Sequence, residues 1–174
     1  METPIRQRIL FAALDLAESE GYKSLTQPRI AKLAGVRQSH LTYYFPRKAD
    51  LLMALLDAAH ERTASRCTLD LGTADGMLAF IGQLMFDANR MRFFLGIVLE
   101  VSTEPELRPI LDAHARGLAE AVARTYGRPA DDGAVLAFVD RVRGMAIRHL
   151  LDPSLKLAEA NLHNLATDCG LTAA

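Results

Sequence analysis

Apolar residues recur at spacings of three and four along almost the whole chain, which is the periodicity of helices with one buried side. Near the N-terminus this pattern predicts a helix over about 4–20. Thr3 can cap that helix, Pro4 suits its first position and Gly21 suits its end. The apolar stripe of this first helix consists of Ile5, Ile9, Ala12, Ala13 and Leu16.

The same periodicity predicts two short helices and then a series of longer ones. Thr26 is the expected cap of the first short helix, and Pro46 ends the second. Thr103-Glu104-Pro105-Glu106 has the pattern of a capping box that opens a helix. Because Pro109 follows in the second turn, that helix is either kinked there or begins later. These further helices are expected at about 27–34, 37–44, 48–66, 75–88, 91–102, 103–126, 131–151 and 154–169.

Nothing in the pattern indicates strands, since no alternating stretches are joined by a tight-turn signal. The predicted fold class is therefore all-α, with an N-terminal three-helix domain over 1–48 and a larger helical domain over 49–174. Half of the residues are hydrophobic and 24% are charged, which is typical of a folded globular chain.

Charge is distributed unevenly along the chain, although the net charge is only −1. Residues 1–48 carry eight basic and four acidic groups, whereas residues 49–174 carry 12 basic and 17 acidic groups. Such asymmetry indicates an N-terminal part that binds a polyanion. Chance fluctuation is the alternative, because the excess is small.

Several functional classes find no support in the sequence. Cys67 and Cys169 lie too far apart for a disulfide framework or a metal-ligand spacing, so neither a metal site nor a cofactor is predicted. His60-Glu61 begins like the helix of zinc hydrolases, but Ala64 stands where the second histidine would be. We predict that the chain is not an enzyme. A helical catalytic or carrier domain and a protein–protein adaptor are the alternatives.

No stretch resembles a signal peptide or a membrane span. The longest charge-free stretch, Gly76–Phe86, is too short to cross a bilayer. We therefore expect a cytoplasmic protein with no membrane partner.

The stretch from Leu25 to Leu52 has the features of a helix-turn-helix. The first short helix has small and apolar residues on the side that faces the core, and Gly35 makes the turn after it. Apolar residues of the second short helix can anchor it to the first helix of the domain. The inner residues of the first helix are Ile30, Ala31 and Ala34, and the anchors of the second are Val36, Leu41, Tyr44 and Phe45. The residues left pointing outward are Gln38, Ser39, His40, Thr42 and Tyr43.

These outward side chains suit a DNA groove. Glutamine can bond adenine with two hydrogen bonds, and hydroxyl groups can bond bases or phosphates. Thr26, Tyr43 and Lys48 are placed to contact phosphates on either flank. For each single residue the alternative is an ordinary solvated helix surface. The full set of predicted DNA contacts is Thr26, Arg29, Arg37, Gln38, Ser39, His40, Thr42, Tyr43 and Lys48.

Residues 5–56 resemble the N-terminal domain of TetR-family regulators. The shared pattern is Glu20-Gly21-Tyr22, Leu25-Thr26, Ile30-Ala31, Ala34-Gly35-Val36, Leu41, Tyr43-Tyr44-Phe45, Lys48 and Leu51-Leu52. The resemblance implies a homodimer that binds a palindromic operator, acts as a repressor and releases double-stranded DNA when its C-terminal domain binds a small molecule. It also implies phosphate contacts at Thr26, Tyr43 and Lys48, and base contacts at Gln38, Ser39, His40 and Thr42.

The chain departs from the family pattern at two positions. Thr42 stands where many members carry an aromatic residue. Pro28 stands where others often have a polar residue that sometimes contacts bases, so either Arg29 replaces that contact or no residue does.

Two apolar stripes near the C-terminus can pack within the chain or form a four-helix bundle with a second subunit, and the resemblance favours the dimer. One stripe consists of Val135, Phe138, Val142, Met145 and His149, and the other of Leu155, Ala158, Leu162, Leu165 and Cys169. The middle of the chain is rich in Met and Phe, which suits an adaptable apolar pocket for an unidentified effector and equally an ordinary core. The predicted pocket residues are Met85, Phe86, Phe94, Glu100, His114 and Arg143.

Overall fold

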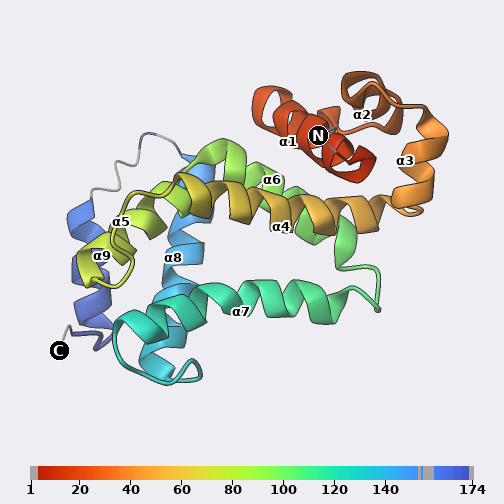
Figure 1. The fold of residues 1–174 in the computed structure, drawn as a ribbon. Helices are drawn as coiled ribbons and strands as arrows, with labels where there is room; N and C mark the ends of the chain where they lie inside the picture. The colour runs from red at the N-terminus through yellow and green to blue at the C-terminus, as the bar shows by residue number, and fades with distance from the viewer. Residues whose placement is uncertain (1–3, 153, 155–158, 173–174) are drawn as a thin grey trace. The chain divides into compact units, whose positions relative to one another are not determined.

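The computed structural model describes residues 4–152, 154 and 159–172, and all regular secondary structure within these residues is helical (Figure 1). The predicted all-α class is therefore confirmed. No helix in the described part of the chain is long and apolar enough to cross a membrane. The elements are α1 (Ile5–Glu20), the 3-10 helix η1 (Tyr22–Ser24), α2 (Gln27–Ala34), α3 (Gln38–Tyr44), α4 (Lys48–Arg66), α5 (Ala74–Met85), α6 (Ala88–Val101), α7 (Arg108–Thr125), α8 (Gly133–Leu151) and α9 (Glu159–Asp168).

The chain forms two compact units. The first comprises Met1–Arg66 and Arg92–Leu111, and the second comprises Cys67–Met91 and Asp112–Ala174. One boundary between the units follows the end of α4, and the other two fall inside α6 and α7.

The core of the first unit forms around α1, which contacts α2, α3 and α4. Ile9, Ala13 and Leu16 are buried as the stripe predicts, and Ile5 and Ala12 are half-buried. The core also takes apolar side chains from α2, α3, α4 and the part of α6 that belongs to this unit: Ile30, Leu41, Leu52, Leu55, Phe93, Ile97 and Val101. Burial of this continuous cluster stabilises the arrangement of the first four helices.

The ends of α1 show how its flanking residues act. Pro4 is predicted to be the first residue of the helix, but it occupies the N-cap, and the helix begins at Ile5. The Pro4 carbonyl accepts a hydrogen bond from the Arg8 amide. Gly21 ends the helix with a φ of 81°, a conformation that L side chains rarely adopt. The predicted cap Thr3 lies outside the described residues.

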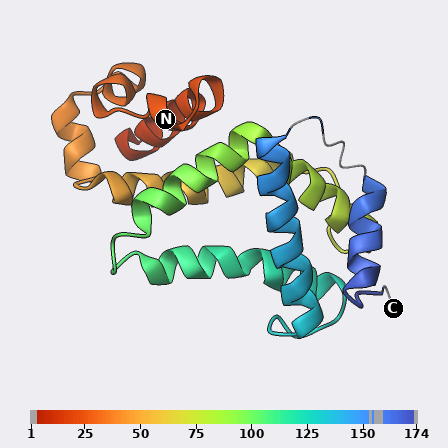
Figure 2. The same cartoon turned by 180° about the vertical axis from the view of Figure 1, so that it is seen from behind.

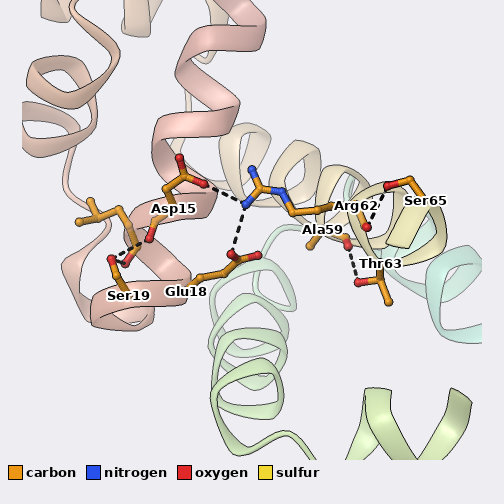
Figure 3. Close-up of polar contacts among 8 residues, drawn as sticks. Asp15, Glu18, Ser19, Ala59, Arg62, Thr63 and Ser65 are labelled. Atoms are coloured by element: carbon orange, nitrogen blue, oxygen red, sulfur yellow. Dashed lines mark hydrogen bonds and ion pairs between the residues drawn. The ribbon is translucent and has the colours of Figure 1, made fainter. Parts of the chain in front are cut away.

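Ion pairs join α4 to α1 on the surface of the same unit (Figure 3). Arg62 donates through Nη1 to Asp15 at 2.9 Å and to Glu18 at 3.2 Å, and its guanidinium lies 5.9 Å from the centre of the Phe11 ring. The Arg62 side chain is only 17% exposed, so its aliphatic stem is packed while its charged end reaches two carboxylates.

The predicted capping box at Thr103 is wrong. The Thr103 hydroxyl donates back to the carbonyl of Glu100, and turns lead on to Arg108, where α7 begins. Pro109 therefore lies in the first turn of α7, where its missing amide hydrogen costs nothing. Of the two alternatives, the later start is correct.

The second unit is built from α5, α8 and α9, which contact one another, together with most of α7 (Figures 1 and 2). In the predicted α8 stripe, Val135, Phe138 and Val142 are fully buried, whereas Met145 and His149 are half-buried. In the predicted α9 stripe, Leu162 is buried and Leu165 and Cys169 are half-buried, while Leu155 and Ala158 lie outside the described residues. The buried members of both stripes thus contribute to the core of a single chain.

Two helices of this unit have side-chain caps. The Thr73 hydroxyl accepts from the amide of Gly76 at the start of α5, and the Asp132 carboxylate accepts from the amide of Ala134 at the start of α8. Asp87 similarly accepts from the Asn89 and Arg90 amides, which explains why α6 begins at Ala88 rather than near the expected residue 91.

Arg62→Ala should destabilise the first unit, because it removes both carboxylate contacts and the packing of the stem against Phe11. We expect the free energy of unfolding to fall by about 1–2 kcal/mol, measured by urea denaturation followed by circular dichroism. Arg66→Ala is the control, since it removes the same charge from an exposed position on the same helix. Equal stability of the two variants would show that the Arg62 contacts contribute nothing.

Candidate nucleic-acid interface

The turn between α2 and α3 depends on a glycine and on an arginine from α1. Gly35 has φ 63° and ψ 37°, the left-handed conformation in which a side chain is strained, and the Val36 amide donates to the Ala31 carbonyl to close the turn. Arg8 donates through Nη2 to the carbonyls of Ala34 at 2.7 Å and Gly35 at 3.0 Å. A Cβ at Gly35 would lie 3.1 Å from that same nitrogen. Arg8 thus binds carbonyls that the end of α2 leaves without helical partners.

One side of α3 is buried in the first unit. Leu41 and Phe45 are buried and Val36 is half-buried, as predicted for anchors of the second short helix. The guanidinium of Arg6 lies 5.3 Å from the centre of the Phe45 ring. Tyr44 was also predicted as an anchor, but it is exposed and its ring packs edge-on against Tyr43 at 5.1 Å. The prediction for Tyr44 is wrong because its position, next to Phe45, turns it out of the core.

The opposite side of α3 is exposed, as the pattern predicts. Its exposed residues are Gln38, Ser39, His40, Thr42 and Tyr43, and Tyr43 shows 79% of its surface to solvent. The Thr42 hydroxyl donates to the Gln38 carbonyl at 3.2 Å, which keeps its oxygen at the helix surface. Gln38 donates through Nε2 to Oε1 of Gln27 at 3.3 Å. Arg37, at the N-cap, is exposed as well.

A cavity of about 310 Å³ lies beside α3, between the starts of α2 and α4. Its polar lining residues are Thr26, Gln27, Arg47 and Lys48. Its apolar lining residues are Leu25, Ile30, Leu41, Phe45 and Leu51, all of which are buried. The cavity thus brings together Thr26 and Lys48, two of the predicted phosphate contacts. Thr26 occupies the N-cap of α2 as expected, but its side chain makes no capping bond, so the expected cap chemistry is wrong.

Lys48 and Arg47 have carboxylate partners in the same unit. The Nζ of Lys48 lies 3.0 Å from Oε1 of Glu100, and the guanidinium of Arg47 bonds both Asp50 and Glu106. The hydrogen bond from Arg47 lowers the pKa of Asp50 below its usual value. Glu100 and Glu106 belong to the segment 92–111, so carboxylates from far along the chain reach the start of α4.

Arg29 is also engaged by a carboxylate. It bonds Glu20, at the end of α1, with distances of 2.5 and 2.6 Å to the two carboxylate oxygens. This bond raises the pKa of Arg29. Arg29 therefore joins α2 to α1, and a base contact by Arg29 would require this pair to open.

The residues predicted to line a ligand pocket are distributed over both units. Phe94 and Glu100 belong to the first unit, and Glu100 is the partner of Lys48. In the second unit Met85 is buried, and Phe86 packs edge-on against His149 at 6.0 Å. His114 is half-buried, and Arg143 donates to the carbonyl of Ala115 at 2.5 Å. A shared pocket for these residues stays a prediction.

Three residues of this surface were missed by the sequence analysis. Arg8 and Arg47 were counted only as charges, and Gln27 only as a helix start. The signal for Arg8 was weak but present, since a basic residue on α1 can reach the end of a helix packed against it. The pairing of Arg47 with Glu106 has no local signal, because 59 positions separate them.

Comparison with known families shows two adjoining matches. Residues 9–61 match the family described as bacterial regulatory proteins of the tetR family. Residues 70–168 match the family described as tetracyclin repressor-like C-terminal domain. The first match includes the α2–α3 pair and the second covers most of the remaining helices.

Curated relatives match this chain over part of its length. The chain is 32% identical over 79 residues to the nucleoid occlusion factor SlmA of Marinobacter nauticus, covering 45% of this chain and 40% of that protein. It is 43% identical over 51 residues to the HTH-type transcriptional regulator RutR of Escherichia coli K12, covering 29% and 24%. The chain spans about 40–50% of the length of the SlmA proteins that it matches.

Solved structures share the fold over nearly the whole chain. The multidrug binding protein EbrR in complex with imidazole has a TM-score of 0.71 at 24% identity, over 97% of this chain and 96% of that one. The complex of EbrR with ethidium has a TM-score of 0.72 at 23% identity, over 95% and 98%. At this identity the likeness establishes the arrangement of helices.

Proposed function

The chain belongs to the TetR family of bacterial regulatory proteins, and from this membership we propose that it is a repressor that binds a palindromic operator as a dimer. The family is one of regulators and not of enzymes. Residues 1–48 form the DNA-binding domain in this proposal, and residues 49–174 form the domain for dimerisation and effector binding. The observation that carries the proposal is α3, whose apolar side is buried while its polar side is exposed.

The exposed side of α3 carries side chains that can recognise base edges in the major groove of DNA. Gln38, Ser39, His40 and Thr42 supply donors and acceptors for base edges, and Arg37 adds a positive charge at the start of the helix. In the proposed complex phosphates are contacted by Tyr43 on α3 itself, by Thr26 just before α2 and by Lys48 at the start of α4, which fixes the position of α3 on the duplex. Arg29 contributes only when its pair with Glu20 opens.

Selection of bound sites from random DNA should yield a short inverted repeat, with half-sites separated by about one helical turn or more, about 10 base pairs or above. On a selected site, Tyr43→Ala combined with Lys48→Ala should weaken binding at least about tenfold, because it removes two phosphate contacts. Fluorescence anisotropy at fixed salt measures this change.

Arg124→Ala is the control for net charge, since Arg124 is an exposed residue of α7 in the second unit. Unchanged binding by the Tyr43/Lys48 double variant, or no enriched sequence in the selection, would overturn the proposal. In that case a protein–protein adaptor becomes the better description.

On α8 a second copy of the chain can pack against exposed apolar side chains, which share one side of the helix with the exposed Asp140. Leu136, Ile147 and Leu151 are exposed, and with Gly144 they follow one another at spacings of eight, three and four, which places them on one side of the helix. This side differs from the predicted stripe, whose residues Val135, Phe138 and Val142 are buried within the chain. Exposed apolar side chains in a row are typical of a surface covered by a partner. We assign this side of α8 to the dimer.

Leu136→Glu combined with Ile147→Glu should convert the dimer into a monomer, because two carboxylates would be buried in the interface. Sedimentation velocity at micromolar concentration measures the change. Leu99→Glu is the matched control, because Leu99 is 74% exposed on α6. A monomeric wild type, or a double variant that sediments like the wild type, would contradict the assignment.

The effector is a small and mostly apolar molecule in this proposal. Three observations support it: the match of residues 70–168 to the tetracyclin repressor-like domain, the Met- and Phe-rich middle of the chain, and the shared fold with EbrR, a protein named for binding multiple drugs. Binding releases DNA only if the effector prefers the conformation with low affinity for DNA.

An aromatic compound such as proflavin, which is bound by EbrR in one of its structures, is a first probe. At about 100 times its Kd it should raise the melting temperature of the DNA-free protein by about 5 °C or more. Differential scanning fluorimetry without an added dye, using intrinsic tyrosine emission, measures this shift. If no compound in a chemically diverse set stabilises the protein or weakens operator binding, a ligand-independent regulator replaces this part of the proposal.

A further inference from the structure

The starts of α2 and α3 are joined by a hydrogen bond between two glutamines. Gln27 is the first residue of α2 and Gln38 is the first residue of α3. Nε2 of Gln38 donates to Oε1 of Gln27 at 3.3 Å, across 11 positions of sequence. Gln38 is exposed, whereas Gln27 is half-buried at the edge of the cavity lined by Thr26 and Lys48. The more buried glutamine therefore accepts a hydrogen bond from the more exposed one.

This bond fixes which way the amide of Gln38 faces. A glutamine amide has two N–H donors and one acceptor oxygen. After one N–H of Gln38 is given to Gln27, the second N–H and Oε1 remain for another partner. Adenine offers an acceptor at N7 and a donor at N6 in the major groove, which is the complement of that remaining pair. If the Gln38 amide alone were turned by 180°, its oxygen would face the oxygen of Gln27, and two acceptors repel each other. The orientation of Gln38 is therefore set by that of Gln27, which a phosphate accepting from Gln27 Nε2 would hold.

The amide nitrogen of Gln27 has two hydrogen-bond donors. Because its oxygen accepts from Gln38, its Nε2 carries two N–H groups on the rim that Gln27 shares with Thr26 and Lys48. Thr26 and Lys48 are the residues assigned above to phosphates, so a phosphate bound there lies within the region that the Gln27 amide can reach. Donors at the start of a helix are favourably placed for an anion.

We propose that Gln27 is a positioning residue for base recognition, which orients the Gln38 amide towards adenine while its own amide nitrogen donates to a DNA phosphate. The inference rests on the proposed function, since it requires α3 to lie in the major groove. Ordering of the Gln38 side chain before DNA arrives reduces the entropy that recognition must overcome. The same residue then links the register of the protein on the backbone to the identity of one base pair.

Substitutions at Gln27 separate its two roles. Gln27→Met keeps the size of the side chain but loses both the acceptor and the donors. Gln27→Glu keeps an acceptor for Gln38 and replaces the donors with a negative charge. Gln7→Met, on the exposed surface of α1, is the matched control for loss of a glutamine amide.

The experiment measures the affinity of the full chain for its selected site and for the same site with the adenine read by Gln38 replaced by guanine. The adenine is identified as the position whose preference is lost in Gln38→Ala. We expect Gln27→Met to lower the adenine-to-guanine affinity ratio about three- to tenfold, since one good bidentate contact discriminates by at least that much. Gln27→Glu should keep the ratio within about twofold of wild type while weakening both sites, because its carboxylate meets a phosphate. Gln7→Met should behave as wild type.

Three outcomes overturn the inference. One is a Gln27→Met variant that weakens both sites by the same factor, which makes Gln27 a phosphate contact alone. The second is a ratio unchanged from wild type. The third is a ratio that Gln27→Met lowers equally in the Gln38→Ala background, because the effect would then not pass through Gln38. Melting temperatures identify a variant that fails to fold, and Gln27→Ala then takes the place of Gln27→Met. Absence of sequence preference in the wild type would instead overturn the proposed function.

Discussion

The orientation of α3 depends on how α1 holds the turn at Gly35. The left-handed conformation of Gly35 sets the angle between α2 and α3, and Arg8 bonds the two carbonyls at that turn. On the inner side of α3, Leu41 and Phe45 are buried in a core that α1 shares with α4. The outer side of α3 is thereby fixed on a rigid support, as recognition of a groove demands.

The same helix α1 is joined to α4 at its other end by Arg62. Two kinds of interaction are combined here, since apolar burial supplies most of the stabilisation and the charged contacts select one arrangement among similarly packed ones. The stem of Arg62 packs against Phe11 while its charge reaches Asp15 and Glu18. A shift of α4 along α1 would break these contacts at once, so the start of α4, with Lys48, keeps a defined position relative to α3.

Sequence analysis was accurate where local chemistry decides the structure. The short helices follow from Gly35 and Pro46, whose backbones permit few alternatives, and the exposed face of α3 follows from periodicity. It failed at Thr103, because a capping box is a local pattern and the chain there continued through turns to Arg108. It gave no sign that Glu100, a predicted pocket residue, lies against Lys48, because 52 positions separate the two residues. It found the apolar stripe of α8 but could not tell that helices of the same chain cover it.

The ion pairs at the start of α4 have a consequence for the thermodynamics of the proposed complex. Glu100 and Glu106 are counter-ions that the protein carries with it, held against Lys48 and Arg47. When Lys48 binds a DNA phosphate, the duplex releases a condensed cation. The carboxylate of Glu100, which then no longer pairs with Lys48, attracts a cation from solution. Ion uptake then partly offsets ion release, and the slope of log affinity against log salt is shallower than the number of phosphate contacts implies. Counting contacts from that slope alone would therefore give too few.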